Sequence, residues 1–495
     1  MNNLIRKNHQ YLVIFITSLL IFVVFALMKD EFHMDEILSI SIGNGLESQA
    51  TGYFMYDVTE SWLPRESFKI FNANEHAFDF QRVYQSYSFD NHPPLFGYVT
   101  HFMSSIFPSK LSHYLFYIPN YIFMIISSII SCALTNKITK NSNISLLTLF
   151  VSLFSVVIIK DTLFIRMYAL CNLMAVSTLF ISYELISTTG YKLYVPLLYF
   201  CVFLGSLTQY YYYIFLAGLA LTTAVYLIYE KKYKLLTICS FVVIAAVLTS
   251  FHYYPAAVNS LLNSTHTSAA ISNVETSDTF MRIIYQFKNL PMISLFTILM
   301  IVALFYLILR KKVSYDMKWL LSIFCFYFII VSKISTYVTH RYMIPINSLY
   351  VIIIAVIIKL FIDEHKEYTN IIYGLIVISL FCGYINNGFD FNNTIKWAKN
   401  HSNLDAIVIS NEGVDFNTTN SMLFDLREYN SVWFTNLKTN DGTLLDRELI
   451  FYLGNEYDID YIENFIEPHK ENYELLKIDD YINNGYQIYS YRPFK

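Results

Sequence analysis

Long apolar runs recur along most of the chain, and they decide its fold class. About eleven of these runs have the length and composition of a membrane-spanning helix. They cover residues 11–28, 111–135, 144–159, 164–187, 193–209, 212–229, 235–251, 291–309, 318–332, 342–361 and 370–386. Only 15% of the 495 residues are charged, against about a quarter in soluble domains. We therefore expect an α-helical polytopic membrane protein whose first run is retained as an anchor.

Basic residues are concentrated in alternate loops between these runs, and such residues favour the cytoplasmic side of a membrane. They occur at Arg6, Lys7, Lys137, Lys140, Lys192, Lys231, Lys232, Lys234, Arg310, Lys311, Lys312 and Lys318. We expect a multi-pass protein of the plasma (inner) membrane with a cytoplasmic N-terminus. With an odd number of spans, the segment 29–110, the loop 252–290 and the tail after 387 share the extracytoplasmic side.

The chain divides into a membrane domain, residues 1–386, and a C-terminal domain, residues 387–495. Composition changes at this boundary, because the tail holds 18 acidic and 9 basic residues. Its short apolar runs, at 406–410, 432–435, 449–453 and 486–491, alternate with polar stretches that are compatible with helices. We predict a small soluble extracytoplasmic α/β domain.

The segment 29–110 is too long for a simple connector. Its stretches 53–62 and 78–87 mix aromatic and charged residues, as helices in the membrane interface do. A His-Pro-Pro motif at 92–94 then precedes an apolar stretch, 95–107, that is too short to span comfortably. We expect this stretch to be re-entrant or to lie flat on the membrane.

An acidic pair directly after the first apolar run is the first candidate for chemistry. The pair is Asp35 and Glu36. One carboxylate can act as general base on an acceptor hydroxyl, while its neighbour orients a partner, pairs with an arginine or binds a divalent cation. Alternatively, such a pair caps a helix or lies solvated.

A few basic residues lie next to the membrane on the outer side, against the sorting preference. They are Lys160, Arg166, Lys333 and Arg341. A cation at the level of the lipid headgroups can hold an anion there, most simply a lipid-linked phosphate. The simpler alternative is a long side chain that extends to the interface from the end of a span.

Four stretches of the chain carry, in this order, a resemblance to a known family: Asp35-Glu36, Asn91-His92-Pro93-Pro94-Leu95, Ile165-Arg166-Met167-Tyr168-Ala169-Leu170 and His340-Arg341-Tyr342-Met343-Ile344-Pro345. Together they resemble the polyprenyl-phosphate-sugar glycosyltransferases of the GT-C superfamily, in the branch of the protein O-mannosyltransferases and the lipid A aminoarabinose transferase. A weaker fifth stretch is 207–211, where family members often have histidine in place of Gln209. The resemblance covers the membrane part, residues 1–386.

The resemblance implies a GT-C-like catalytic membrane domain that moves a hexosyl or pentosyl group from a polyprenyl-phosphate donor to an acceptor hydroxyl, with inversion at the anomeric carbon. It implies Asp35 as general base and Glu36 as a positioning or metal-binding carboxylate, with Mg²⁺ or Mn²⁺ as the cation if one is used. Arg166 and Arg341 then hold the lipid phosphate. The expected partners are the donor, the bilayer and a protein, lipid or glycan acceptor, with no nucleic acid.

Four further residues are candidates for substrate binding: His92, Lys333, Tyr168 and Tyr342. His92 either binds the donor or a metal, or belongs to a motif that only shapes a helix entry. The two tyrosines neighbour the expected phosphate site and are otherwise interface anchors.

Three other functions stay open. The first is a polytopic transporter or flippase of a lipid-linked glycan, which places ionisable residues or broken helices near the bilayer midplane. The predicted spans are nearly free of charge, which argues against it. The second is a non-catalytic envelope assembly protein. The third is a related transferase that uses lipid pyrophosphate donors.

Overall fold

The computed structural model describes residues 2–29, 32–46, 62–110, 112–187, 192–276, 278–288, 290, 294–386, 398–409, 423–435, 448–454, 460, 462, 473–481 and 486–493. The chain forms two compact units, each assembled from separate parts of the sequence. Unit 1 consists of Met1–Ala26, Asn91–Phe96 and Phe116–Gly388. Unit 2 consists of Leu27–Asp90, Gly97–Leu115 and Phe389–Lys495.

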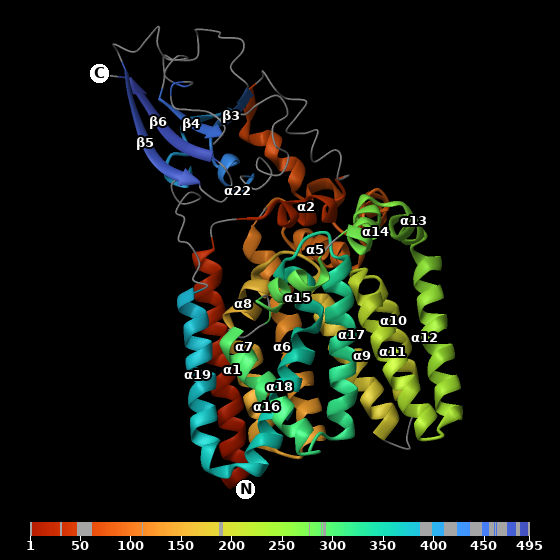
Figure 1. The fold of residues 1–495 in the computed structure, drawn as a ribbon. Helices are drawn as coiled ribbons and strands as arrows, with labels where there is room; N and C mark the ends of the chain where they lie inside the picture. Colours follow the sequence, from red (N-terminus) through yellow and green to blue (C-terminus); the bar gives the residue numbers. More distant parts are fainter. Residues whose placement is uncertain are drawn as a thin grey trace. The chain divides into compact units, whose positions relative to one another are not determined.

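Unit 1 is a bundle of α-helices (Figure 1). Among the described residues, seven helices are long and apolar enough to cross a membrane. They are α1 (Asn2–Met28), α6 (His113–Thr139), α9 (Tyr168–Ser187), α11 (Tyr211–Tyr229), α12 (Tyr233–Tyr253), α17 (Tyr315–Ile334) and α18 (Asn347–Glu364). An eighth candidate is the pair α7 (Ser142–Phe154) and α8 (Val156–Leu163), bent by 50°. The α-helical polytopic class predicted from the apolar runs is confirmed.

Shorter elements complete unit 1: α10 (Tyr194–Ser206), α13 (Ala256–Asn263), α14 (Thr265–Thr276), α15 (Thr279–Phe287), α16 (Ser294–Leu309), α19 (Thr369–Asn386) and the 3-10 turns η3 (His340–Tyr342), η4 (Ile344–Ile346) and η5 (Lys366–Tyr368). α10 and α16 are apolar but short for a span. The helices α13, α14 and α15 lie in the predicted outer loop 252–290.

The helices of unit 1 differ in which surfaces they bury. In α18, every residue from Asn347 to Ile358 is buried, which matches a sequence that is apolar all round. In α12, by contrast, only Ala246 and Ser250 are buried, although the helix is equally apolar. An apolar helix surface that no protein covers is what contact with lipid tails requires, because lipid satisfies no polar group.

Three turns that follow helices of unit 1 use lysine in a left-handed conformation. Lys140, Lys231 and Lys311 have φ values of 52°, 57° and 55°. Glycine is the usual residue at such a helix end, and a side chain there costs about 1–2 kcal/mol. The three lysines belong to the loops predicted to be cytoplasmic. A positive charge is what the predicted cytoplasmic location favours, in spite of the backbone cost.

Unit 2 contains a six-stranded mixed sheet in the order β1-β3-β2-β4-β6-β5 (Figure 1). Its strands are β1 (Trp62–Pro64), β2 (Asp405–Ile409), β3 (Ser431–Thr435), β4 (Leu449–Gly454), β5 (Tyr473–Tyr481) and β6 (Tyr486–Pro493). The central strands β3, β2 and β4 are parallel, and the outer pairs are antiparallel. β2 is buried at every residue, as expected of a parallel strand covered on both faces. The four apolar runs of the tail are the strands β2, β3, β4 and β6.

The edge strand β1 comes from the first loop rather than from the tail. Trp62 lies opposite Trp433 of β3, with ring centroids 5.9 Å apart. Directly after β1, the Arg65 side chain donates to the backbone carbonyl of Tyr429 at 2.9 Å and to those of Ser402 and Glu428. Unit 2 therefore contains residues of both predicted domains, 1–386 and 387–495.

The remaining elements of unit 2 are α2 (Met34–Gly43), η1 (Arg65–Phe71), η2 (Asn74–His76), α4 (Phe80–Ser88), α5 (Leu95–Ile106) and α22 (Leu423–Leu426). α4 lies at the predicted helix 78–87, and α5 at the short apolar stretch 95–107. The predicted helix 53–62 lies outside the described residues except for Trp62. Glycine permits the close approach of these helices, because a Cβ at Gly43 would collide with Thr100 and one at Gly97 with Tyr87.

Arg65 should be needed to hold the first loop on the sheet. We expect Arg65→Ala to lower the free energy of unfolding by about 1–3 kcal/mol, because carbonyl groups lose a charged donor. Thermal unfolding of the purified protein measures this, with Lys69→Ala as control, since Lys69 is exposed and pairs with the exposed Glu66. Equal stability of the two variants would contradict the assigned role.

Candidate functional site

The residues singled out from the sequence are divided between the two units. Asp35 and Glu36 belong to unit 2. The remaining six belong to unit 1: His92, Arg166, Tyr168, Lys333, Arg341 and Tyr342. Each group has its own set of contacts.

The acidic pair lies in the first turn of α2. His33 is the N-cap residue, and its Nδ1 accepts a hydrogen bond from the Asp35 backbone N–H at 3.1 Å. The Glu36 Oε2 accepts one from the His33 backbone N–H at 3.0 Å, which completes a capping box. The helix-capping alternative raised by the sequence is confirmed for Glu36.

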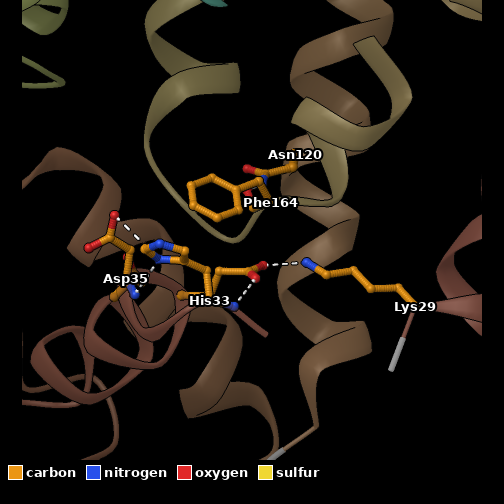
Figure 2. Close-up of polar contacts among 7 residues, drawn as sticks. Lys29, His33, Asp35, Asn120 and Phe164 are labelled. Atoms are coloured by element: carbon orange, nitrogen blue, oxygen red, sulfur yellow. Dashed lines mark hydrogen bonds and ion pairs between the residues drawn. The ribbon is translucent and has the colours of Figure 1, made fainter. Parts of the chain in front are cut away.

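Glu36 also forms a buried ion pair. The Lys29 Nζ lies 2.5 Å from its Oε1, and the two side chains are 10% and 1% exposed (Figure 2). Burial lowers the pKa of the Lys29 ammonium group, and the Glu36 carboxylate opposes this shift. Both oxygens of Glu36 thus accept hydrogen bonds. Lys29 was not predicted, and the only signal for it was a cation directly after the first span.

Asp35 has a different environment. Its Oδ2 lies 3.6 Å from the His33 Nδ1 (Figure 2), and the His33 side chain is 50% exposed. Because this nitrogen already accepts the Asp35 N–H bond, it carries a lone pair, and a neutral ring holds its proton on Nε2. In that tautomer the imidazole donates no proton to Asp35 through Nδ1.

In unit 1, Arg166 lies in the turn between α8 and α9. Its backbone N–H donates to the Phe164 carbonyl at 2.7 Å, and Asn120 Nδ2 of α6 donates to the same oxygen at 3.0 Å (Figure 2). The Phe164 ring stacks on Tyr168 with centroids 6.1 Å apart. Arg166 and Tyr168 are buried, at 6% and 3% exposure. The turn therefore holds the arginine in a fixed, buried position.

Arg341 and Tyr342 lie in η3, between α17 and α18. The Tyr327 hydroxyl donates to the Tyr342 carbonyl at 2.7 Å and fixes this turn. The Arg341 guanidinium carbon lies 5.3 Å from the centre of the Tyr342 ring and 6.0 Å from that of Tyr337. These distances are within the range of cation–π attraction. An aromatic partner orients a guanidinium without cancelling its charge.

Tyr211, at the start of α11, links two of the motif stretches. Its ring lies 4.8 Å from the Tyr342 ring. Tyr168 and the guanidinium groups of Arg341 and Arg282 are ionisable neighbours of its hydroxyl. We refer to Tyr168, Tyr211, Tyr342, Arg282 and Arg341 as the tyrosine–arginine cluster.

Arg282 is a member of this cluster that the sequence did not indicate. It lies on α15, and its Nε donates to the Ser332 carbonyl at 2.7 Å. Its Nη2 also donates to Ser335, so the guanidinium caps the last turn of α17. Lys333, predicted as a substrate-binding residue, lies half-buried in that same turn. Arg282 escaped prediction because it lies in the middle of a loop, away from any apolar run.

The His-Pro-Pro motif contacts the fifth stretch of the resemblance. The Leu95 backbone N–H donates to the Leu207 carbonyl at 3.1 Å. The Tyr254 hydroxyl donates to the His92 carbonyl at 3.4 Å. Gln209, which stands where the family often has histidine, accepts a hydrogen bond from the Tyr211 backbone N–H at 2.5 Å. Gln209 therefore orders the turn that leads into α11.

A buried carboxylate on α8 was missed by the sequence analysis. Asp161 is 3% exposed, and its Oδ2 accepts a hydrogen bond from Asn347 Nδ2 at 2.9 Å. Its Oδ1 lies 3.4 Å from His340 Nε2. In the sequence, Asp161 follows the end of the predicted apolar run 144–159 and resembles an ordinary loop residue. Only the fold brings it to the residue that precedes Arg341.

Metal ligands are sparse in the part of the chain that the structure describes. It contains no group of three or more His, Cys, Asp or Glu side chains placed to hold a metal ion. At the acidic pair, both oxygens of Glu36 accept bonds from Lys29 and His33. A Mg²⁺ or Mn²⁺ site at Asp35 and Glu36 stays a prediction.

The sequence matches no protein-family model, and a search of curated proteins finds no match either. The resemblance to the GT-C superfamily therefore rests on the residues of the motif stretches themselves.

Removing one member of the Lys29–Glu36 pair should cost more stability than removing both members together. We expect Glu36→Gln to destabilise the protein by about 3 kcal/mol, because an ammonium group is left buried without its carboxylate. The double variant Lys29→Met/Glu36→Gln should recover much of this loss. Thermal unfolding in detergent measures both effects. The exposed Glu66 provides the control variant, Glu66→Gln, for which we expect almost no change. Additive losses in the double variant would contradict the pairing.

Proposed function

We propose that the protein is a membrane glycosyltransferase that moves a sugar from a polyprenyl-phosphate donor to an acceptor hydroxyl on the extracytoplasmic side. One observation carries the proposal. Within unit 1, stretches of the resemblance that are far apart in sequence interact. The Leu95 backbone N–H donates to the Leu207 carbonyl, the Tyr211 ring packs on the Tyr342 ring, and Tyr168 is an ionisable neighbour of Tyr211. A set of motifs without a shared function has no reason to converge in this way.

The chemistry of the residues suits this reaction. Transfer of a glycosyl group passes through an oxocarbenium-like state while negative charge builds up on the departing phosphate. We propose that Arg166 and Arg341 hold this phosphate, because a guanidinium binds phosphate oxygens with two parallel donors. Both are held in place, Arg166 by its buried turn and Arg341 by aromatic rings.

The remaining roles follow the same scheme. Asp35 acts as the base that takes the acceptor proton, in a single displacement that inverts the anomeric carbon. Glu36 positions the start of α2 through its bonds to Lys29 and His33. Four residues complete the substrate-binding set: His92, Tyr168, Lys333 and Tyr342.

We further propose that all eleven predicted apolar runs span the membrane. The helices at these runs are α1, α6, the bent pair α7 and α8, α9, α10, α11, α12, α16, α17, α18 and α19. The sheet of unit 2 supports an odd number of spans. β1, which follows the first span, pairs with β3, which follows the last. Strands cannot pair across a bilayer, so an even number of crossings separates them. The C-terminal α/β domain is then extracytoplasmic if the N-terminus is cytoplasmic.

A transporter or flippase of a lipid-linked glycan is the second candidate. It is favoured by the bend between α7 and α8 and by the buried Asp161 on α8, since transporters use broken helices and intramembrane carboxylates. The partners of Asp161 are neighbours of the proposed phosphate site, so a buried carboxylate here is as compatible with a transferase as with a transporter. A non-catalytic envelope assembly protein would give neither transfer nor transport.

Sugar release from a radiolabelled polyprenyl-phosphate hexose or pentose tests the proposal directly. Purified protein with pooled envelope acceptors should transfer the label. Asp35→Asn, which keeps the shape and removes the basicity, should reduce the rate by roughly 100-fold or more. Glu66→Gln, the same kind of change at an exposed carboxylate, is the control and should keep the wild-type rate. Folded wild-type protein that transfers no sugar from a panel of donors would contradict the proposal and favour transport or assembly.

Cysteine labelling in intact cells tests the orientation. Glu474, on β5, and Glu230, at the end of α11, are both exposed. We expect Glu474→Cys to react with an impermeant thiol reagent and Glu230→Cys to react only after permeabilisation. The wild-type protein, with its six cysteines, gives the background. The reverse pattern would overturn the proposed topology.

A further inference from the structure

Asp161 is a buried acid with polar neighbours at both of its carboxylate oxygens. One oxygen is occupied by the neutral amide of Asn347 at 2.9 Å. The other lies 3.4 Å from the His340 imidazole, the only cationic partner within ion-pair distance in the described part of the chain. A carboxylate this deeply buried is costly to ionise unless a charged or hydrogen-bonding partner compensates. Asp161 and His340 therefore form a pair that becomes an ion pair when the imidazole is protonated.

The two members of this pair differ in accessibility. Asp161 has a side chain that is 4% exposed, whereas that of His340 is 51% exposed. His340 can therefore face a ligand while Asp161 stays inside. The pair is fixed from both sides, because Asp161 lies on α8 and Asn347 begins α18. This is the arrangement in which a buried carboxylate orients an imidazole and stabilises its protonated form.

Basic residues neighbour the pair along the chain. Lys160 directly precedes Asp161 on α8. Arg341 follows His340 in η3, and Arg166 lies in the turn that follows α8. His340 is thus the one group in this set that can release a proton near neutral pH, since guanidinium groups stay protonated.

We propose that His340, held by Asp161, is the proton donor to the departing lipid phosphate, with Asp161 as the positioning residue. The inference rests on the proposed transferase function. In the step, the bond between the anomeric carbon and the phosphate oxygen breaks with its electron pair on oxygen, while the acceptor oxygen bonds to the same carbon. The acceptor proton goes to Asp35, and the His340 proton goes to the phosphate, which leaves as a monoanion instead of a dianion.

A histidine can protonate the departing phosphate, whereas an arginine can only pair with its charge. A phosphate monoester carries a second negative charge above about pH 6. Arg166 and Arg341 offset part of that charge, but only a titrating group removes it. The proton must be restored before the next turnover, and the half-exposed ring of His340 is open to solvent for this purpose.

Single-turnover transfer and donor binding, each measured across pH, test the role. We expect the wild-type rate to fall as the pH rises and His340 loses its proton. His340→Gln should bind the donor about as well as wild type, transfer roughly 100-fold more slowly, and lose this alkaline fall. Asp161→Asn, which can still accept the Asn347 bond, should move the fall to lower pH, because the imidazolium loses its carboxylate. His252→Gln, an exposed histidine on α12, is the control and should behave as wild type.

The outcomes separate this role from the proposed function. If wild type transfers sugar and His340→Gln does so with the same rate and pH profile, the proton-donor role alone is overturned. A loss confined to donor binding also overturns it, because His340 would then be a binding residue. If His340→Gln fails to fold, the pH profile of Asp161→Asn decides in the same way. Wild-type protein that transfers no sugar overturns the proposed function and this role with it.

Discussion

A bilayer offers no water to a charged side chain, so an ionised group that this chain buries must find its partner within the protein. The described residues follow this constraint. In unit 2, Lys29 pairs with Glu36, and in unit 1 the buried Glu184 pairs with Lys137. Asp161 accepts a hydrogen bond from Asn347, and its other oxygen lies 3.4 Å from His340. The buried charges named here therefore lie at helix ends and turns, and the turns are where the proposed transfer from a lipid phosphate would take place.

The same constraint explains why the candidate residues lie on rigid backbone. Arg166 occupies a turn whose Phe164 carbonyl is bonded from two directions. Arg341 occupies η3, whose carbonyl at Tyr342 takes the Tyr327 hydroxyl. Arg282 closes the end of α17. Breaks in helices expose backbone groups that lipid cannot satisfy, so side chains must satisfy them. These bonds fix the turns that carry Arg166 and Arg341, whereas Arg282 bonds through its own guanidinium. Donors on rigid backbone stabilise a developing charge with little reorganisation.

The sequence was most informative where one physical effect dominates. Apolar runs predicted the helices because length and hydropathy decide what crosses a bilayer. Alternating short apolar runs predicted β2, β3, β4 and β6. The sequence offered no prediction where an element depends on a partner that is distant along the chain. Nothing in residues 62–64 indicates a strand, because β1 is defined by its pairing with β3. Asp161 and Arg282 resembled loop charges, since only tertiary structure brings them to His340 and to the end of α17. Glu36 was assigned by its chemistry, whereas its capping box depends on local backbone geometry.

The central claim is that the arginines of unit 1 bind a lipid phosphate, and equilibrium binding of a polyprenyl phosphate to purified protein in nanodiscs tests it most directly. We predict that Arg341→Ala weakens binding by about 10- to 100-fold. The affinity of Arg341→Lys should lie between those of wild type and Arg341→Ala, because lysine keeps the charge and loses the two-pronged contact. Arg310→Ala removes another exposed arginine that lies over a tyrosine ring and should leave binding unchanged. Uncharged polyprenol should bind all variants equally. Equal affinity of wild type and Arg341→Ala for the phosphate would contradict the account.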